Sequence, residues 1–348
     1  MSPHILTIFL FCLGLGTMVT FSSSHWLLAW MGLEINTLAI IPLMAQHHHP
    51  RAVEATTKYF LIQAAAAATL LFAGMINAWI TGQWYINDMV HPVPSTVMTL
   101  ALALKLGLAP AHAWLPDVLQ GLNLNIGLVL ATWQKLAPFS LLLQMQHSSP
   151  LLLVFLGLLS TLVGGWGGLN QTQLRKILAY SSIAHLGWML LVLQFSPNLT
   201  LLTLLLYFVM TFSIFSLFAL NNSTSINSLA TAWTKAPALS ALAPLILLSL
   251  GGLPPLAGFL PKWMIIQELS HQGMALFTTI AALSALLSLY FYLRLSYAMT
   301  LTFSPNNITG ALNWRLSNKS INLPLAISSS VTVLLLPLAP AMTSIIMP

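Results

Sequence analysis

Residues 199–220 read LTLLTLLLYFVMTFSIFSLFAL and contain no charged side chain. A helix needs about 20 residues to cross the hydrocarbon core of a bilayer, and this stretch provides them without interruption. In lipid, backbone hydrogen bonds are satisfied only in helices or in closed barrels, and the stretch is too long and too continuously apolar for a barrel strand. The sequence therefore predicts a transmembrane α-helix here.

The composition extends this prediction to the whole chain. Hydrophobic residues make up 57% of the 348 residues, charged residues only 5%, and the mean hydropathy is +0.86. This little polar surface cannot cover a water-soluble globule. We therefore predict an all-α polytopic membrane protein in which residues 1–348 form a single transmembrane domain. Its apolar runs give about eleven spans, with the fourth and the ninth broken: 3–22, 25–45, 54–80, 96–121, 124–146, 150–170, 173–194, 199–220, 237–268, 274–300 and 322–346.

Lysine and arginine in the connections between spans predict the orientation of the chain. The even-numbered connections carry these residues: Arg51, Lys58, Arg175, Lys176, Lys235, Arg315 and Lys319. The odd-numbered connections contain none. We therefore expect the N-terminus and the even connections on the positive side, matrix or cytoplasm, and the C-terminus on the other side.

Motifs for redox, nucleotide or metal chemistry are missing from the sequence. Cys12 is the one cysteine, so the chain cannot form an internal disulfide or ligate an iron–sulfur cluster. Neither a P-loop nor a dinucleotide-binding glycine pattern is present. His47, His48 and His49 could bind a metal in principle, but three adjacent histidines in a polar connection are better explained as solvated. The N-terminus also lacks the features of a cleaved signal or a presequence, so we expect insertion at the place of synthesis, or through the first span.

Four ionisable side chains lie inside apolar runs: Glu34, Lys105, Lys135 and Lys262. A charge at the centre of a spanning helix costs at least about 2.5–3.5 kcal/mol, so these residues are candidates for a proton path. Two structural explanations compete with this hypothesis. A Glu34–Lys105 pair could simply hold helices together, and Lys262 in particular could extend its ammonium group to the membrane surface.

An internal repeat connects two of these regions. Residues 107–117, GLAPAHAWLPD, align without a gap to residues 252–262, GLPPLAGFLPK. The copies fall in the fourth and ninth predicted spans, and an odd separation makes them cross the membrane in opposite directions, as in transporters with inverted repeats. Because proline disrupts helices, we expect Pro110 to free the carbonyl of Leu106 and Pro261 that of Ala257, next to a hydrated cavity. Pro138 should similarly loosen the carbonyl of Gln134 beside Lys135.

Two histidines are further candidates for proton relay, because the ordinary pKa of histidine is near 6.5. His112 lies seven residues after Lys105, nominally on the same helical face, and His185 lies near the centre of the seventh span. An interior histidine that is merely hydrogen-bonded is an equal alternative for each.

Five stretches make the chain recognisable. They closely resemble the antiporter-like membrane-arm subunits of vertebrate mitochondrial NADH:ubiquinone oxidoreductase, respiratory complex I. These stretches are 27–34 (LLAWMGLE), 101–117, 132–138 (TWQKLAP), 164–185 and 251–263. The resemblance covers essentially the whole chain and implies eleven helices, where bacterial relatives have fourteen. It also implies proton-transfer roles for the positions of Glu34, Lys105, Lys135 and Lys262. Residues 123–127 (NLNIG) depart from the bacterial pattern, which leaves the water path there open.

The resemblance further implies partners, cofactors and a location. The partners are other complex I subunits, especially neighbouring antiporter-like subunits, and membrane lipids such as cardiolipin, but no nucleic acid. NADH, FMN, iron–sulfur clusters and ubiquinone belong to other subunits, and no cofactor is expected in this chain. The expected location is the mitochondrial inner membrane, with the N-terminus in the matrix and the C-terminus in the intermembrane space.

Elementary electrostatics supplies a mechanism for the predicted path. Loss of solvent disfavours a charged amine and a neighbouring carboxylate favours it, so making or breaking a Glu34–Lys105 pair would change the proton affinity of Lys105. Ubiquinone reduction elsewhere could toggle this pair, with Lys135 passing a proton to Lys262. Two other functions stay open at this point. A free-standing cation/proton antiporter would need more acidic residues than five, and a purely structural scaffold would need none of the lysines.

Overall fold

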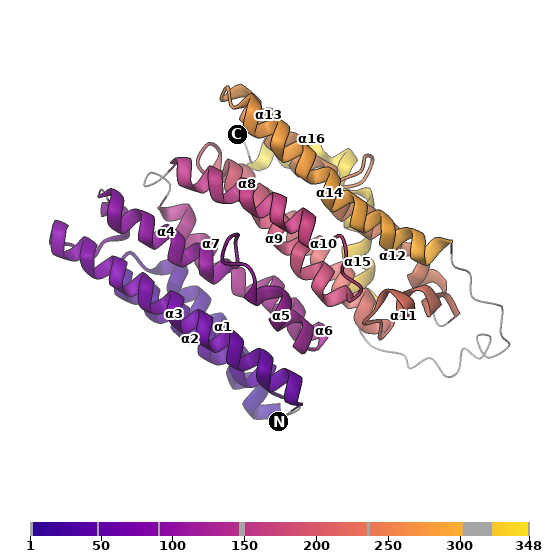
Figure 1. Ribbon diagram of the computed structural model, residues 1–348, viewed down its shortest axis with the longest axis horizontal. Coiled ribbons are helices and arrows are strands. Elements are labelled where there is room, and N and C mark those ends of the chain that lie inside the picture. Colours follow the sequence, from indigo (N-terminus) through magenta and orange to yellow (C-terminus); the bar gives the residue numbers. More distant parts are fainter. Residues whose placement is uncertain are drawn as a thin grey trace. The chain divides into compact units, whose positions relative to one another are not determined.

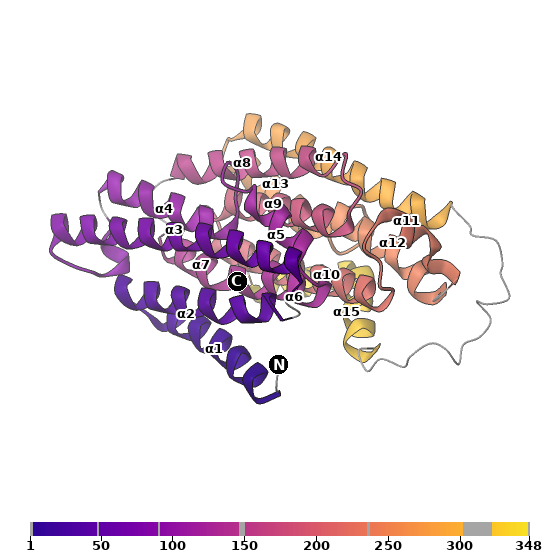
Figure 2. The same cartoon turned by 60° about the horizontal axis from the view of Figure 1, so that its bottom comes forward.

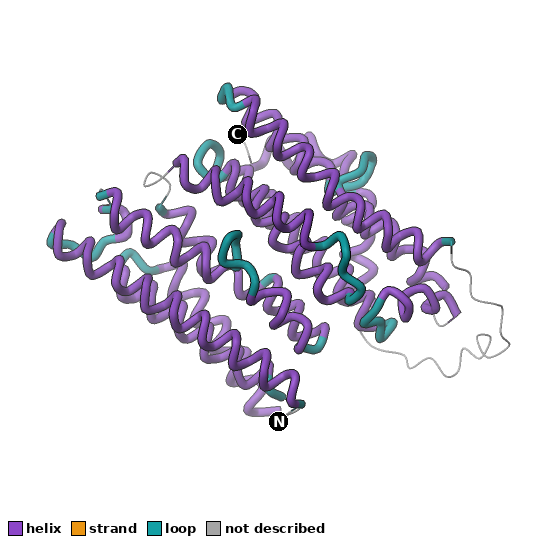
Figure 3. The backbone as a smooth tube through the Cα atoms, viewed as in Figure 1, coloured by secondary structure: helices purple, strands orange, loops and turns teal. Residues whose placement is uncertain are grey.

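The computed structural model describes residues 3–46, 49–89, 91–145, 150–234, 237–301 and 322–346. Figures 1 and 2 show it from two directions. Every regular element in these residues is a helix, as the colouring of Figure 3 makes plain. Extended pairing in this part of the chain is limited to two isolated bridges, His25 with Tyr85 and Gln173 with Ser225. The predicted all-α class is confirmed.

The helices group into two compact units, residues 1–160 and 161–348, with the boundary inside α8 (Pro150–Gly167). Unit 1 contains the following elements before α8: α1 (Pro3–Ser22), α2 (Trp26–Met44), α3 (Pro50–Thr81), η1 (Ile86–Asp88), α4 (Pro92–Leu106), α5 (Trp114–Gly121), α6 (Leu124–Ala131) and α7 (Trp133–Gln144). Within it, α2 packs against α1 and α3, and α3 packs against α4 and α5.

Glycine allows close contact between α1 and α2. A Cβ atom on Gly16 of α1 would lie 2.9 Å from the carbonyl oxygen of Gly32 on α2, and a Cβ on Gly32 would lie equally close to the carbonyl oxygen of Gly16. Small residues at such positions let two membrane helices approach backbone to backbone. The segment of α2 after Gly32, which carries the functional candidates, is therefore held tightly against α1.

Unit 2 contains the rest of α8 and the following elements: α9 (Leu174–Val192), α10 (Pro197–Leu220), α11 (Ile226–Ala230), η2 (Thr231–Thr234), α12 (Pro237–Gly251), α13 (Phe259–His271), α14 (Ala275–Thr300), α15 (Asn322–Leu334), η5 (Leu336–Leu338) and α16 (Ala339–Ile346). Helix α14 packs along α12, and α10 packs against α15. Gly164 of α8 faces Ala184 of α9, where a Cβ atom would meet the Ala184 backbone nitrogen at 2.7 Å.

Within the described residues, seven helical segments are long and apolar enough to cross a membrane: α1, α2, α3, α6 together with α7, α8, α10 and α14. The pair α15 and α16, bent by 67°, makes an eighth if it is one span. The other three predicted spans correspond to α4 with α5, to α12 with α13, and to α9. The first two are interrupted, and polar residues lower the hydropathy of α9. The count of eleven spans is therefore not confirmed and stays a prediction.

Candidate functional site

Both predicted broken helices are interrupted by the same turn. Helix α4 ends before Gly107, whose φ is +77°, and α12 ends before Gly252, whose φ is +81°. In each case the following residue donates its N–H to a carbonyl five positions back: Leu108 to Ala103 at 3.0 Å, and Leu253 to Leu248 at 3.3 Å. This is a Schellman-type cap, which needs a left-handed residue after the helix. The repeat seen in the sequence is thus a repeat of local structure at the helix break.

The glycines, and not the predicted prolines, end these helices. Pro261 lies in the first turn of α13, where a missing N–H costs no helical hydrogen bond. The carbonyl of Ala257 accepts the N–H of Leu260 at 3.3 Å, so the prediction that Pro261 frees it is wrong. The break near Lys135 lies at Thr132, between α6 and α7, while Pro138 sits inside α7. A charged residue still lies beside each of the three breaks, as predicted.

A cavity in unit 1 brings two of the predicted lysines together. Lys105 and Lys135 are only 6% and 3% exposed, and both line a cavity with about 20 Å³ available to the centres of water molecules. One water needs roughly 10–15 Å³ by this measure. The cavity residues come from α2, α3, α4, α6, α7 and the segment around α5: Leu33, Asn36, Thr37, Tyr59, Gln63, Lys105, Leu106, Trp114, Leu115, Leu130, Gln134, Lys135, Ala137 and Pro138.

Glu34 and Lys105 do not form a contact ion pair. Both the Lys105 Nζ and the Glu34 Oε2 are buried, and neither has a hydrogen-bond partner among the described residues. The Glu34 carboxylate nevertheless interacts electrostatically with Lys105 and with Tyr59. The backbone carbonyl of Lys105 accepts a hydrogen bond from Gln63 Nε2 at 3.3 Å, which ties the end of α4 to α3. The predicted direct pair is therefore replaced by two buried, oppositely charged groups that act across a gap.

Lys262 occupies a different environment, in unit 2. It lies on α13, is 8% exposed, and its Nζ donates to the carbonyls of Gly251 at 2.6 Å and Leu250 at 3.4 Å. These carbonyls end α12, so the ammonium group lies at the negative end of a half-helix. A Cβ atom on Gly252 would come within 2.7 Å of the Lys262 Cδ. Glycine at 252 is thus needed both for the turn and for the lysine beside it. The alternative in which Lys262 extends to the surface does not describe this geometry.

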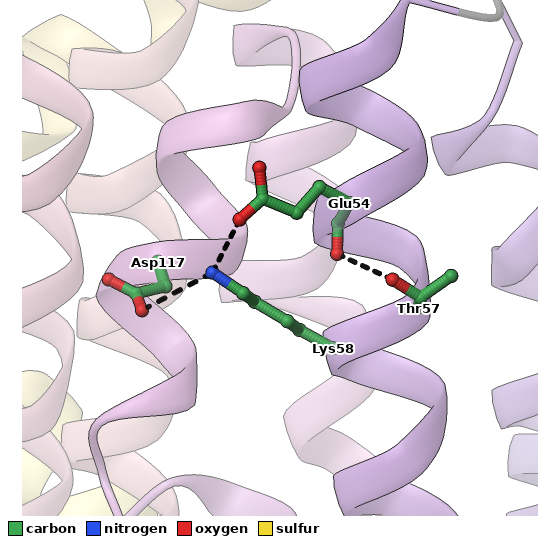
Figure 4. A network of polar contacts seen from close by, with 4 residues as sticks. All are labelled: Glu54, Thr57, Lys58 and Asp117. Atoms are coloured by element: carbon green, nitrogen blue, oxygen red, sulfur yellow. Dashed lines mark hydrogen bonds and ion pairs between the residues drawn. The ribbon is translucent and has the colours of Figure 1, made fainter.

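In the first broken helix, a tryptophan binds a terminal carbonyl in place of a lysine. Trp114, at the start of α5, donates its indole N–H to the carbonyl of Leu104 at 3.2 Å. Asp117, the residue aligned with Lys262, instead faces Lys58 of α3 at 3.9 Å, and Lys58 also pairs with Glu54 at 2.7 Å. Figure 4 shows this network and the hydrogen bond from Thr57 to the Glu54 carbonyl. Its charged groups are about half exposed, so it contributes little to stability.

The histidines are placed as follows. His112 lies in the turn between α4 and α5, with its Nδ1 3.1 Å from the Pro110 carbonyl oxygen. Because α4 has already ended, the predicted common helical face with Lys105 is wrong. His185 lies on α9 in unit 2, with its ring 5.4 Å from that of the buried Tyr207. His47 and His48 lie outside the described residues, and His49 caps α3 by accepting the Arg51 N–H.

Sequence reasoning missed two polar residues inside helices. Arg294 of α14 donates from Nη1 to the Leu169 carbonyl at 2.5 Å and from Nη2 to the Gln171 carbonyl, so it binds the chain just after α8. Its charge inside an apolar run was visible in the sequence. Asn36 of α2 is 2% exposed and lines the cavity. Its position two residues after Glu34 was the available signal.

Comparisons with known proteins identify the family of the chain. Residues 23–288 match the family described as NADH:quinone oxidoreductase/Mrp antiporter, TM, and residues 289–343 match NADH dehydrogenase subunit 2 C-terminus. An NADH-ubiquinone oxidoreductase chain 2 from Tetraodon nigroviridis is 68% identical over 345 residues, which cover 99% of each chain.

Two solved structures share the fold. A chain of respiratory complex I from Thermus thermophilus with bound aureothin is 28% identical, with a TM-score of 0.82 over 98% of this chain and 81% of that one. A chain of the Mrp complex from Dietzia sp. is 17% identical, with a TM-score of 0.77 over 95% of this chain and 74% of that one, and shows likeness of fold alone.

Proposed function

Since the chain belongs to the NADH:quinone oxidoreductase/Mrp antiporter transmembrane family, we propose that its buried lysines carry protons across the membrane arm of respiratory complex I. The resemblance inferred from the sequence is confirmed, and the chain is an antiporter-like subunit of that complex. Its catalytic contribution is to the proton-translocating NADH:ubiquinone reductase as a whole. NADH, FMN, iron–sulfur clusters and ubiquinone would be bound by other subunits.

The observation that supports the proposal most strongly is the shared cavity of Lys105 and Lys135. Two buried amines face one space that has room for water. An amine deprived of solvent gives up its proton more readily than an exposed one, and water can bridge groups that do not touch. Glu34 would set the charge of Lys105 across the gap between them. Lys135 would then receive the proton from Lys105.

Lys262 would receive the proton from Lys135 at a later step of the path. Its ammonium form is stabilised by the terminal carbonyls of α12, so this group is built to hold a proton. We also propose His185 and His112 as relays of protons. His185 has the stronger claim because it lies inside unit 2 beside Tyr207, whereas His112 hydrogen-bonds within its own turn.

The alternative functions account for less of the geometry. A cation/proton antiporter needs a site that attracts a metal ion, whereas the residues that the structure describes around the cavity include two lysines and no carboxylate. A structural scaffold would not need two amines beside a water-sized space. Scaffolding predicts that neutralising either lysine spares proton transfer, and this separates it from the proposal.

We also propose eleven spans and inverted repeats, with the N-terminus in the matrix and the C-terminus in the intermembrane space. The bridge between Gln173 and Ser225 supports α9 as a span. Gln173 lies just before α9 and Ser225 just after α10, so the two helices together start and end at the same side. If α10 crosses the membrane, α9 must cross it in the opposite direction. The 19 residues of α9 extend about 28 Å, close to the thickness of the hydrocarbon core. The bridge between His25 and Tyr85 likewise flanks two crossings, α2 and α3.

Large apolar side chains on the outside of the helices fit membrane surroundings. Trp79 is 91% exposed, Leu151 80% and Trp166 75%. Neighbouring antiporter-like subunits and lipids such as cardiolipin would cover such residues in the assembled complex.

The decisive experiment replaces Lys135 by Met in the assembled complex. The proton-to-electron ratio should fall while the amount of assembled complex stays normal, because methionine has a similar volume and no titratable group. Lys105→Ala should have the same effect. An unchanged ratio in both variants would refute the proposal and favour the scaffold.

A further inference from the structure

Asn36 is a neutral polar residue of the cavity that Lys105 and Lys135 share. Its side chain is 2% exposed, and its amide nitrogen and oxygen both lack a hydrogen-bond partner among the described residues. Buried amides are almost always hydrogen-bonded, to protein or to ordered water. The Asn36 carboxamide therefore requires a ligand that can both donate and accept.

The residues that line the cavity limit what this ligand can be. The Lys105 Nζ is a second buried group without a partner in the described part of the chain, and it lines the same space. About 20 Å³ is available there to water centres, which fits one small molecule. Two lysines make a metal cation unfavourable. A water molecule both donates and accepts, so it meets the requirements of the Asn36 amide and of the Lys105 ammonium.

We propose that Asn36 is a positioning residue that holds a water molecule between Lys105 and Lys135, and that the proton crosses on this water. The inference rests on the proposed function and assigns a part in it to a residue without charge. A carboxamide suits the role because it offers one acceptor and two donors and does not titrate. A carboxylate at this position would bind a lysine directly and would trap the charge.

The backbone around Asn36 is fixed. Its carbonyl accepts a hydrogen bond from Gln134 Nε2 at 3.2 Å, which joins α2 to α7 one residue before Lys135. A Cβ atom on Gly16 would lie 3.3 Å from the Asn36 Cγ, so α1 leaves the side chain little room to turn away. The Asn36 carboxamide is therefore held in place at the wall of the cavity.

Asn77 provides a matched control. It lies on α3, is 0% exposed, and has an amide whose two polar atoms also lack partners in the described residues, but it is not among the cavity residues. Asn36→Leu and Asn77→Leu make the same chemical change at equal burial. We expect the proton-to-electron ratio of the assembled complex to fall in Asn36→Leu to the level of Lys135→Met, and to stay at the wild-type level in Asn77→Leu.

Two further measurements separate positioning from folding. Asn36→Ser keeps a donor and an acceptor in a smaller side chain, and it should recover at least half of the ratio lost in Asn36→Leu. A map of the wild type that resolves waters should place one within hydrogen-bonding distance of the Asn36 carboxamide. In a map of Asn36→Leu, that water position should be empty.

The outcomes are distinct. If Lys135→Met lowers the ratio while Asn36→Leu pumps like Asn77→Leu, the role of Asn36 is refuted and the lysine path stands. If Lys135→Met and Lys105→Ala both pump normally, the proposed function fails, and this inference fails with it. If Asn36→Leu does not assemble, Asn36→Ser decides: a wild-type ratio with the water in place supports the role, and a ratio as low as that of Lys135→Met overturns it.

Discussion

The glycine that ends α12 sets the position of the Lys262 ammonium group, so replacing this glycine should disable the lysine without removing it. In Gly252→Ala the new Cβ would lie 2.7 Å from the Lys262 Cδ and 2.9 Å from its Nζ. The flexible lysine side chain is the partner that gives way. It should then leave the Gly251 carbonyl, which it now contacts at 2.6 Å.

The size of the effect follows from two terms. Alanine in a left-handed conformation costs roughly 1–2 kcal/mol. Loss of a hydrogen bond from a charged donor costs about 1.5–3 kcal/mol more. Gly273 provides the control for the first term alone, because its φ is +72° and its Cβ position is open. The two alanine variants should therefore share the backbone cost. Only Gly252→Ala should also shift the protonation equilibrium of Lys262, by about 10- to 150-fold.

The assay is the proton-to-electron ratio of the assembled complex in proteoliposomes, with assembly checked on native gels. Gly252→Ala should lower the ratio, and Gly273→Ala should leave it unchanged. In the Lys262→Met background, adding Gly252→Ala should change the ratio no further, since its target is gone. Equal ratios for the two single alanine variants would refute the idea that Gly252 acts through Lys262.

Two other positions give simpler tests. Arg294→Leu removes two charged hydrogen bonds to the Leu169 and Gln171 carbonyls, each contributing about 1.5–3 kcal/mol. We therefore expect several-fold less assembled complex and faster proteolysis at residues 168–173. Arg294→Lys should recover only part of the assembled complex, and wild-type amounts in Arg294→Leu would contradict the anchoring role. Lys58→Met removes the exposed pairs with Glu54 and Asp117 and should change neither assembly nor the proton-to-electron ratio; a clear loss of proton transfer would instead make this network part of the path.

The sequence was most informative where one physical term dominates. Lys105, Lys135 and Lys262 were predicted to be interior because lysine in an apolar run has few alternatives, and all three are buried in the structure. The helix breaks were located because proline disrupts a helix, although glycine is the residue that ends both helices. Which of the two residue types ends the helix was not predictable from composition. It depends on the φ angle at Gly107 and Gly252, which only the folded backbone reveals.

Side-chain partners were predicted less well, because they depend on distances between helices. The Glu34–Lys105 pair was expected from opposite charge, yet both groups stay out of contact in the structure. His112 was placed by counting along a helix that ends before reaching it. Asn36 was overlooked because a neutral amide carries no charge, although burying such a group without a partner still costs roughly 2–7 kcal/mol.

The two broken helices use one backbone turn to prepare two different electrostatic situations. In unit 1 the indole of Trp114 binds a terminal carbonyl of α4, so the nearby Lys105 ammonium is not needed there and faces the cavity. In unit 2 the ammonium of Lys262 binds the terminal carbonyls of α12 itself. A lysine that depends on a carboxylate across a gap responds to movement of that carboxylate. A lysine fixed to a helix end responds only when its own turn moves. In the proposed path, Lys105 is therefore the better placed of the two to sense a distant redox event, and Lys262 the better placed to retain a proton until the turn at Gly252 changes.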